Sequence, residues 1–205
     1  MRILKIGIIC GSHRKDSESA KVSSYFETLI KADQKDIYLL KLGTSGIPLW
    51  EESAWTDGEV WKEKWQPHSK ELKTCDGFLI VSPEYGGMAA PAIKNFFLLC
   101  NKQELSHKPG LIVTVSGARG GAYPVSELRA SSYKNTQICY IPEHIIVRNA
   151  KQVLNDNPEN PLEEDLYLRK RIPYALKLLY SYTDALQLVR NSSIPDYRAF
   201  GNGMS

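Results

Sequence analysis

Near-continuous apolar runs that alternate with helix-like segments constrain the fold of this chain more than any other feature. The runs span residues 2–10, 36–42, 77–82 and 110–116, and a fifth follows near 140–148. Strands that are apolar without alternation are typical of a parallel sheet, since helices cover both of its faces. Repeated strand–helix units therefore predict an α/β fold, a three-layer sandwich with a five-stranded parallel sheet and right-handed crossovers.

The segments between these runs carry the expected helices. They span residues 19–32, 56–65, 67–74, 91–101, 124–136 and 161–190. Ser17 or Ser19 is the expected N-cap of the first helix, and Thr56–Glu59 resembles a capping box for the second. Pro67 suits a first-turn position, whereas Pro173 lies inside the last helix and predicts a kink or a break there.

Length and charge bound the class of protein. At 205 residues with 42% hydrophobic content, we expect a single domain over 1–190 and an irregular C-terminal tail over 191–205. A net charge of +3 is too small to argue for a nucleic-acid or membrane partner. The N-terminal apolar run is interrupted by Lys5 and Gly7, and no run approaches the length of a membrane span. We expect a cytoplasmic protein.

The cysteines and histidines show no metal-ligand spacing. Cys10, Cys75, Cys100 and Cys139 are far apart and include no CxxC pair, so buried free thiols are favoured over zinc or a disulfide framework. The four histidines are interpreted as surface or loop residues. His13 is the exception, because it lies in the loop described next.

Loop one, residues 11–19, follows the first strand and leads into a helix. A helix N-terminus presents free backbone N–H groups and the positive end of the helix dipole, which together favour an anion. Serine hydroxyls and the fork of Arg14 add donors for phosphate oxygens. Neither GxxxxGK[ST] nor GxGxxG follows this strand, which argues against a P-loop or a dinucleotide Rossmann site. An ordinary capped turn with a surface arginine is the alternative.

Loops two and three follow later strands. In loop two, residues 82–91, Gly86 and Gly87 allow close approach to a flat ligand and Tyr85 offers an aromatic ring. Loop three, residues 116–121, places three glycines around Arg119. Taken singly, the loops could be a plain turn and a flexible connector. Ligands of parallel sheets bind beyond the carboxyl ends of the strands, however, and three such loops at successive strand ends predict one site.

Together these motifs resemble the NADPH-dependent FMN reductases, a flavodoxin-like family that includes quinone, azo-dye and chromate reductases. The matching motifs are Gly11-Ser12-x-Arg14-x-x-Ser17, then Pro83-Glu84-Tyr85 leading to Pro91-x-x-Lys94-Asn95, then Ser116-Gly-x-Arg119-Gly-Gly, within residues 3–150. Two departures stand out. Tyr85-Gly86-Gly87 replaces the common Tyr-Asn-Gly, and Phe96-Phe97-Leu98-Leu99 follows Lys-Asn where the family often has an acidic residue.

The resemblance implies bound FMN, with NADPH or NADH as co-substrate, and it assigns roles by position. The FMN phosphate would be held by Ser12, Arg14, Ser17 and Ser19. The isoalloxazine ring would be lined by Pro83, Glu84, Tyr85 and Gly86 on one side and by Ser116, Gly117, Arg119 and Gly120 on the other. No metal is implied.

The expected mechanism leaves the chemistry to the flavin, so no catalytic side chain is assigned. In a ping-pong cycle, NAD(P)H would give a hydride to FMN and leave. A quinone, azo compound, free flavin or metal oxyanion would then take the electrons at the same place. Arg119 could also meet the 2′-phosphate of NADPH.

Helix 91–101 is apolar nearly all round, which predicts a homodimer through it, and the family implies extension to a homotetramer. Burial beneath the C-terminal helix is the alternative. Two other functions stay open: a flavodoxin-like electron carrier, and a non-catalytic sensor that binds flavin or another phosphorylated ligand. The slight positive charge argues against the carrier, whose partners usually dock on an acidic face.

Overall fold

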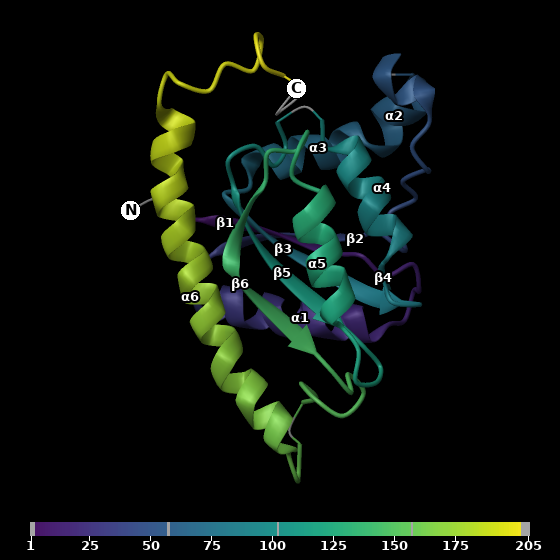
Figure 1. Cartoon of the computed structure of the whole chain (residues 1–205), viewed down its shortest axis with the longest axis vertical. Coiled ribbons are helices and arrows are strands. Elements are labelled where there is room, and N and C mark those ends of the chain that lie inside the picture. The colour runs from purple at the N-terminus through teal and green to yellow at the C-terminus, as the bar shows by residue number, and fades with distance from the viewer. Residues whose placement is uncertain (1–2, 57, 102, 157, 202–205) are drawn as a thin grey trace.

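The computed structural model describes residues 3–56, 58–101, 103–156 and 158–201, and it has a twisted sheet with helices on both faces (Figure 1). The central strands are β1 (Lys5–Cys10), β3 (Gly77–Tyr85) and β5 (Pro109–Val115), and the edge strands are β2 (Asp36–Lys41) and β6 (Cys139–Val147). Their order is β2-β1-β3-β5-β6, and every neighbouring pair is parallel. This confirms the predicted flavodoxin-like five-stranded parallel sheet.

A sixth strand, β4 (Met88–Ala89), was not predicted. It folds back on β3 as an antiparallel hairpin in which Glu84 pairs with Ala89 and Tyr85 with Met88. The hairpin lies in loop two, so β3 extends three residues beyond the apolar run that the sequence marked at 77–82. The extension carries Glu84 and Tyr85 past the edge of the sheet.

Two helices cover one face of the sheet. They are α1 (Glu18–Ala32) and the long C-terminal α6 (Glu163–Asn191), and their buried side chains, such as Phe26 and Ile172, pack in one core with Ile6 and Ile8 of β1. Ser17 is the N-cap of α1, because its side chain accepts a hydrogen bond from the backbone N–H of Ala20.

The opposite face is covered by α3 (Gln66–Thr74), α4 (Pro91–Leu99) and α5 (Ala122–Ser131), with the short α2 (Glu59–Lys64) beside them (Figure 1). Leu72 of α3, Ile93 of α4 and Leu128 of α5 share a second core with Phe78 and Ile80 of β3. Since α4 and α6 belong to opposite faces, the alternative that α4 is buried beneath the C-terminal helix is wrong.

The expected capping box at Thr56–Glu59 is also wrong. Thr56 ends a short 3₁₀ helix, η1 (Glu52–Thr56), and its hydroxyl donates to the carbonyl of Ser53. Gly58 is the N-cap of α2 and makes no side-chain cap, while Asp57 lies outside the described residues. Pro67 sits in the first turn of α3, as expected.

Three details of the elements differ from the sequence expectation: the proline inside α6, the end of α5 and the start of β1. α6 runs through Pro173 without a break, because Ile172, Ala175 and Leu176 around the proline are fully buried against the sheet. This packing outweighs the one backbone hydrogen bond that proline removes. α5 ends at Ser131 rather than near 136, since the hydroxyl of Thr136 takes the carbonyl of Ser132 in place of a further helical turn. The first strand begins at Lys5, and Ile3 before it is exposed.

No helix among the described residues is long and apolar enough to cross a membrane.

Candidate active site

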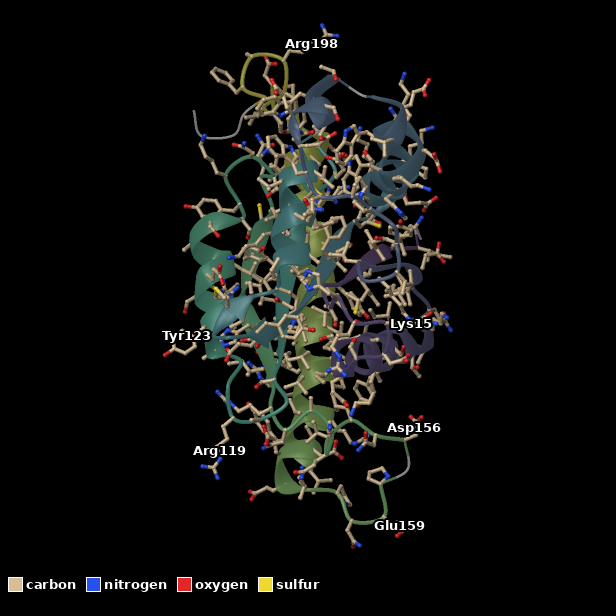
Figure 2. The ribbon with its side chains drawn as sticks, turned by 90° about the vertical axis from the view of Figure 1, so that its right-hand side faces the viewer. Lys15, Arg119, Tyr123, Asp156, Glu159 and Arg198 are labelled. Atoms are coloured by element: carbon tan, nitrogen blue, oxygen red, sulfur yellow. The ribbon has the colours of Figure 1, made fainter. Side chains whose placement is uncertain are left out.

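Loops one, two and three follow β1, β3 and β5, so all three lie at the carboxyl edge of the sheet. Figure 2 looks onto this side of the molecule, with Lys15 of loop one on one flank and Arg119 of loop three on the other. Loops one and two touch directly, because the Ser12 hydroxyl lies 2.9 Å from the Tyr85 hydroxyl. The predicted clustering at this edge is therefore present in the fold.

Loop one is held close to the sheet at its start. The Gly11 N–H donates to the carbonyl of Val81 on β3 at 2.8 Å, and a Cβ at Gly11 would approach Ile93 of α4 to 2.1 Å. The Ser12 side chain is 2% exposed, and its hydroxyl accepts the Arg14 N–H at 3.1 Å. Only glycine therefore fits at position 11. The turn that follows directs Arg14 to the surface.

The N-terminus of α1 opens onto loop one. Ser17 caps the Ala20 N–H at 3.1 Å, and the N–H groups of Glu18 and Ser19 in the first turn have no partner within the helix. Ser19 is 2% exposed, whereas Arg14 is open to solvent. The Ser12 and Ser17 hydroxyls and the free first-turn N–H groups lie at the positive end of the α1 dipole, an arrangement that favours an anion such as phosphate.

Loop two projects as a tight hairpin. Gly86 and Gly87 have φ values of 58° and 76°, and they connect the paired residues Tyr85 and Met88. Positive φ at both central positions is the requirement of a type I′ turn, which Asn-Gly and Gly-Gly both meet. The departure from Tyr-Asn-Gly at Gly86 thus keeps the same backbone. Beside the hairpin, the rings of His13 and Tyr85 lie 6.2 Å apart.

Glu84 connects loop two to loop three. Its Oε2 accepts the Gly121 N–H at 2.7 Å, and a Cβ at Gly120 would lie 2.4 Å from its Oε1. The carboxylate is half-buried and engaged with loop three. Glu84 therefore fixes the position of Gly120 and Gly121 relative to loop two.

Loop three is open on its other side. A Cβ at Gly117 would meet no described atom within 4 Å, and the Ser116 hydroxyl accepts the Ala118 N–H at 3.3 Å. The side chain of Arg119 points away from the body of the molecule (Figure 2). Arg148, just beyond β6, donates from Nε to the carbonyls of Arg119 and Gly120 at 2.9 and 3.1 Å.

Of three further residues that organise this edge, Gly121 belongs to the loop three motif, whereas Arg148 and Glu127 were missed from the sequence. Gly121 has a φ of 105°, and a Cβ there would lie 2.6 Å from Ile146. Arg148 follows an apolar strand and has no motif around it. Glu127 of α5 accepts the Ala89 N–H at 2.6 Å and forms an ion pair with Lys94. Glu127 thus connects α5 to both the loop two hairpin and α4.

Asn95 of α4, the second residue of the Lys94-Asn95 motif, hydrogen-bonds the segment that follows β2. The Asn95 Oδ1 accepts the Trp50 N–H at 2.6 Å, and its Nδ2 donates to the carbonyl of Pro48 at 2.9 Å. Trp50 packs edge-on against Trp55 with their rings 5.1 Å apart. These two rings border a cavity of about 550 Å³ along α4 and α5, whereas Trp61 and Trp65 are buried in the core.

The donor set can be tested against FMN without placing the cofactor. Its phosphate would find the first-turn N–H groups of α1 with the side chains of Ser12, Ser17 and Arg14. For a flat ring, loop three offers the open space beside Gly117, and loop two offers a turn of two glycines. The residues present therefore fit a phosphorylated planar ligand. Among the described residues, no group of His, Cys, Asp or Glu side chains is arranged to hold a metal ion.

The sequence comparisons show which proteins this chain is similar to. The family model described as NADPH-dependent FMN reductase matches residues 4–152. An NADPH azoreductase from Bacillus sp. (strain OY1-2) is 28% identical over 130 residues, which cover 62% of this chain and 68% of the relative. A 2-hydroxy-1,4-benzoquinone reductase from Burkholderia sp. is 27% identical over 168 residues, which cover 79% and 87%.

Two solved structures illustrate the similarity of fold. The flavoenzyme NAD(P)H:(acceptor) oxidoreductase FerB from Paracoccus denitrificans superposes with a TM-score of 0.67 at 18% identity, covering 90% of this chain and 98% of its own. A flavodoxin from the domain Archaea superposes with a TM-score of 0.53 at 12% identity, covering 90% and 99%. At these identities the structures establish the fold alone.

Proposed function

Because this chain belongs to the NADPH-dependent FMN reductase family, which binds FMN and uses NADPH as reductant, we propose that it is a reductase of quinones or azo compounds. Free flavin and metal oxyanions are the other acceptors to test. The quinone and azo classes come first because they are the substrates named for the two relatives above.

One observation supports the proposal most strongly. The three loops that the family motifs mark are joined by hydrogen bonds at one edge of the sheet, one between two side chains and one between a side chain and the backbone. Ser12 contacts Tyr85 at 2.9 Å between loops one and two, and Glu84 contacts the Gly121 N–H at 2.7 Å between loops two and three. A surface assembled from three loops in this way is pre-organised to hold one ligand at several points.

The proposed roles follow from those contacts. Ser12, Arg14, Ser17 and the α1 N-terminus would bind the FMN phosphate, while Gly86, Gly117 and Gly120 would let the backbone approach the ring. The chemistry that FMN supplies when bound is hydride transfer from NAD(P)H to an acceptor. Tyr85 and the hairpin would border the face on which nicotinamide and acceptor bind in turn, which is the basis for a ping-pong scheme.

An anaerobic titration tests the proposal. Purified protein is loaded with FMN, NADPH is added, and the visible flavin spectrum is followed. We expect bound flavin to bleach much faster than free FMN, and then to regain its colour when a benzoquinone or an azo dye is added. In double-reciprocal plots of the steady-state rate against NADPH concentration, lines that stay parallel at different acceptor concentrations would support ping-pong kinetics. Absence of FMN binding would contradict the proposal.

The second candidate is a flavodoxin-like electron carrier, which the fold similarity to the archaeal flavodoxin keeps open. A carrier would bind FMN but leave it oxidised in the presence of NADPH. The same titration therefore separates the two functions. A sensor that binds a different phosphorylated ligand would bind no FMN at all.

We also propose that the functional unit is a homodimer through α4, which two such dimers could extend to a tetramer. Leu98 of α4 is 56% exposed and Trp55 is 65% exposed, and both line the cavity along α4 and α5, so exposed apolar side chains at this cavity support an interface there. Light scattering of the wild type and of Leu98→Glu tests this. We expect twice the monomer mass or more for the wild type and a shift toward monomer for the variant. A monomeric wild type would contradict the interface.

A further inference from the structure

A second cavity lies beside loop three, outside the three motif loops. It has a volume of about 240 Å³ and lies between the last residues of β6 and the first turns of α6. Arg148 and His144 line it from the strand side, and Tyr167 and Arg171 line it from the helix. It runs along the outer strand β6 and reaches the carboxyl edge of the sheet, where the proposed flavin site lies, at Arg148.

Arg148 connects the cavity to that site. Its Nε donates to the carbonyls of Arg119 and Gly120, so the guanidinium lies directly against loop three. Among the described residues no carboxylate forms an ion pair with Arg148, in contrast to Arg171, which pairs with Glu143. Two anchoring bonds from Nε leave the two terminal nitrogens of Arg148 to meet an anion, and a guanidinium binds phosphate oxygens as a fork.

The cavity also offers an aromatic surface. Tyr167 on α6 is 60% exposed, although it lies at a cavity and not in the core. An exposed aromatic ring beside a cation is suited to a nucleobase that carries a nearby phosphate, because the base can stack while the phosphate meets the arginine. An adenosine with a phosphate on its ribose has this combination of groups.

We propose that this cavity binds the adenosine end of NADPH, with Arg148 contacting the 2′-phosphate and Tyr167 stacking on adenine. The proposal rests on the proposed reductase function. Arg148 thereby determines the preference for NADPH over NADH, since NADH lacks this phosphate. The side chain of Arg119, which the sequence suggested for the same contact, points away from the molecule (Figure 2).

Calorimetric titration of the FMN-loaded protein with adenosine 2′,5′-bisphosphate and with 5′-AMP tests the proposal without turnover. We expect the wild type to bind the bisphosphate more tightly than AMP. Arg148→Gln should weaken bisphosphate binding by about 10- to 100-fold, the range of a lost charge-assisted contact, and should bring it close to that of AMP. Arg148→Lys, which keeps the charge without the fork, should fall between the two.

Two further variants keep the result interpretable. Arg198→Gln removes the same charge from the tail at the opposite end of the molecule, and it should bind both ligands as the wild type does (Figure 2). Tyr167→Leu changes an exposed side chain that makes no contact with loop three, so it remains usable if Arg148→Gln fails to fold. It should weaken both ligands, because both contain adenine.

Equal affinity for the bisphosphate and AMP in the wild type would overturn the proposal, and so would unchanged bisphosphate binding in both Arg148→Gln and Tyr167→Leu. A different result would contradict the proposed function, namely the absence of flavin binding or of flavin bleaching by NADPH. A protein whose flavin bleaches with NADPH, but whose bisphosphate affinity ignores Arg148, would retain the reductase function and lose only this site.

Discussion

The Glu84 carboxylate accepts the backbone N–H of Gly121 at 2.7 Å, and this bond makes loops two and three one structural unit. Arg148 secures the same loop from the opposite side, through the carbonyls of Arg119 and Gly120. Loop three is therefore held between a carboxylate and a guanidinium. The glycines of this loop therefore have different surroundings, so an added side chain would affect stability differently from one glycine to the next.

Gly117→Ala and Gly120→Ala should separate ligand contact from folding. At Gly117 a Cβ meets nothing within 4 Å, so we expect its unfolding free energy to stay within about 0.5 kcal/mol of the wild type. Its FMN affinity should fall, because the methyl group occupies the space that we assign to the ring. At Gly120 a Cβ would lie 2.4 Å from Glu84 Oε1, so this variant should lose about 1–3 kcal/mol of stability as well.

Urea denaturation and flavin fluorescence titration measure the two quantities on the same samples. Wild-type FMN affinity in Gly117→Ala would remove that side of loop three from the flavin site. A Gly120→Ala variant as stable as the wild type would show that the Glu84 carboxylate can move aside without cost.

Arg14→Ala should weaken FMN binding by about 1–3 kcal/mol, the range of one lost charge-assisted hydrogen bond to phosphate. Arg14 is exposed, so its removal should leave the unfolding free energy unchanged. Riboflavin, which has no phosphate, should bind wild type and variant alike. Arg198→Ala, an equal change in charge at the other end of the molecule, is the control. An unchanged FMN dissociation constant would exclude Arg14 from the site.

The centre of the sheet could be predicted from the sequence because β1, β3 and β5 are buried on both faces and therefore appear in the sequence as continuous apolar runs. Local signals also limited the N-cap of α1 to Ser17 or Ser19, of which Ser17 is the cap, and placed Pro67 in the first turn of α3. The prediction at Thr56–Glu59 was wrong because a capping box is a pattern of residue types, whereas here Thr56 ends a 3₁₀ helix and its hydroxyl donates to the carbonyl of Ser53. At Pro173 the helix continues because the neighbouring residues are buried against the sheet, and the sequence around a proline does not show this packing.

Long-range contacts explain what was missed at the site. Glu127 of α5 pairs with Lys94 of α4 from 33 positions later in the sequence. Arg148 reaches back 28 residues to the carbonyl of Gly120. Neither relation leaves a spacing that a single sequence can reveal. The motif glycines, in contrast, mark local backbone requirements, and Gly86 and Gly87 have the positive φ values that their type predicts.

Glu127→Gln should destabilise the protein more at pH 7 than at pH 4. The ion pair with Lys94 and the Ala89 N–H hold the pKa of Glu127 below its ordinary value of 4.5, against the opposing effect of burial. A lowered carboxyl pKa in the folded state stabilises the fold above the unfolded value, and this contribution is lost as the pH falls through the folded value. Urea unfolding at both pH values measures it, with Glu63→Gln on the exposed face of α2 as control. Equal losses at both pH values would contradict the ion pair as the cause.

Lys108 gives the opposite dependence on pH, at the end of the sheet remote from the loops. Its Nζ donates to the carbonyls of Leu72, Lys73 and Glu104, and burial lowers its pKa from 10.5 to about 8. Between these values the unfolded chain binds a proton that the folded protein does not. The stability that depends on Lys108 therefore rises with pH from about 8 to about 10, by at most about 3 kcal/mol.

Lys108→Met keeps the length of the side chain and removes the titrating group, so its unfolding free energy should lack this rise. The difference between wild type and variant should accordingly widen as the pH increases from 7 to 10. Taking the difference cancels the titration of the tyrosines, whose burial raises their pKa values in both proteins alike. Lys177→Met, on the exposed side of α6, should follow the wild type throughout. A difference that stays constant with pH would mean that Lys108 remains charged in the fold, held by its three carbonyls strongly enough to offset burial.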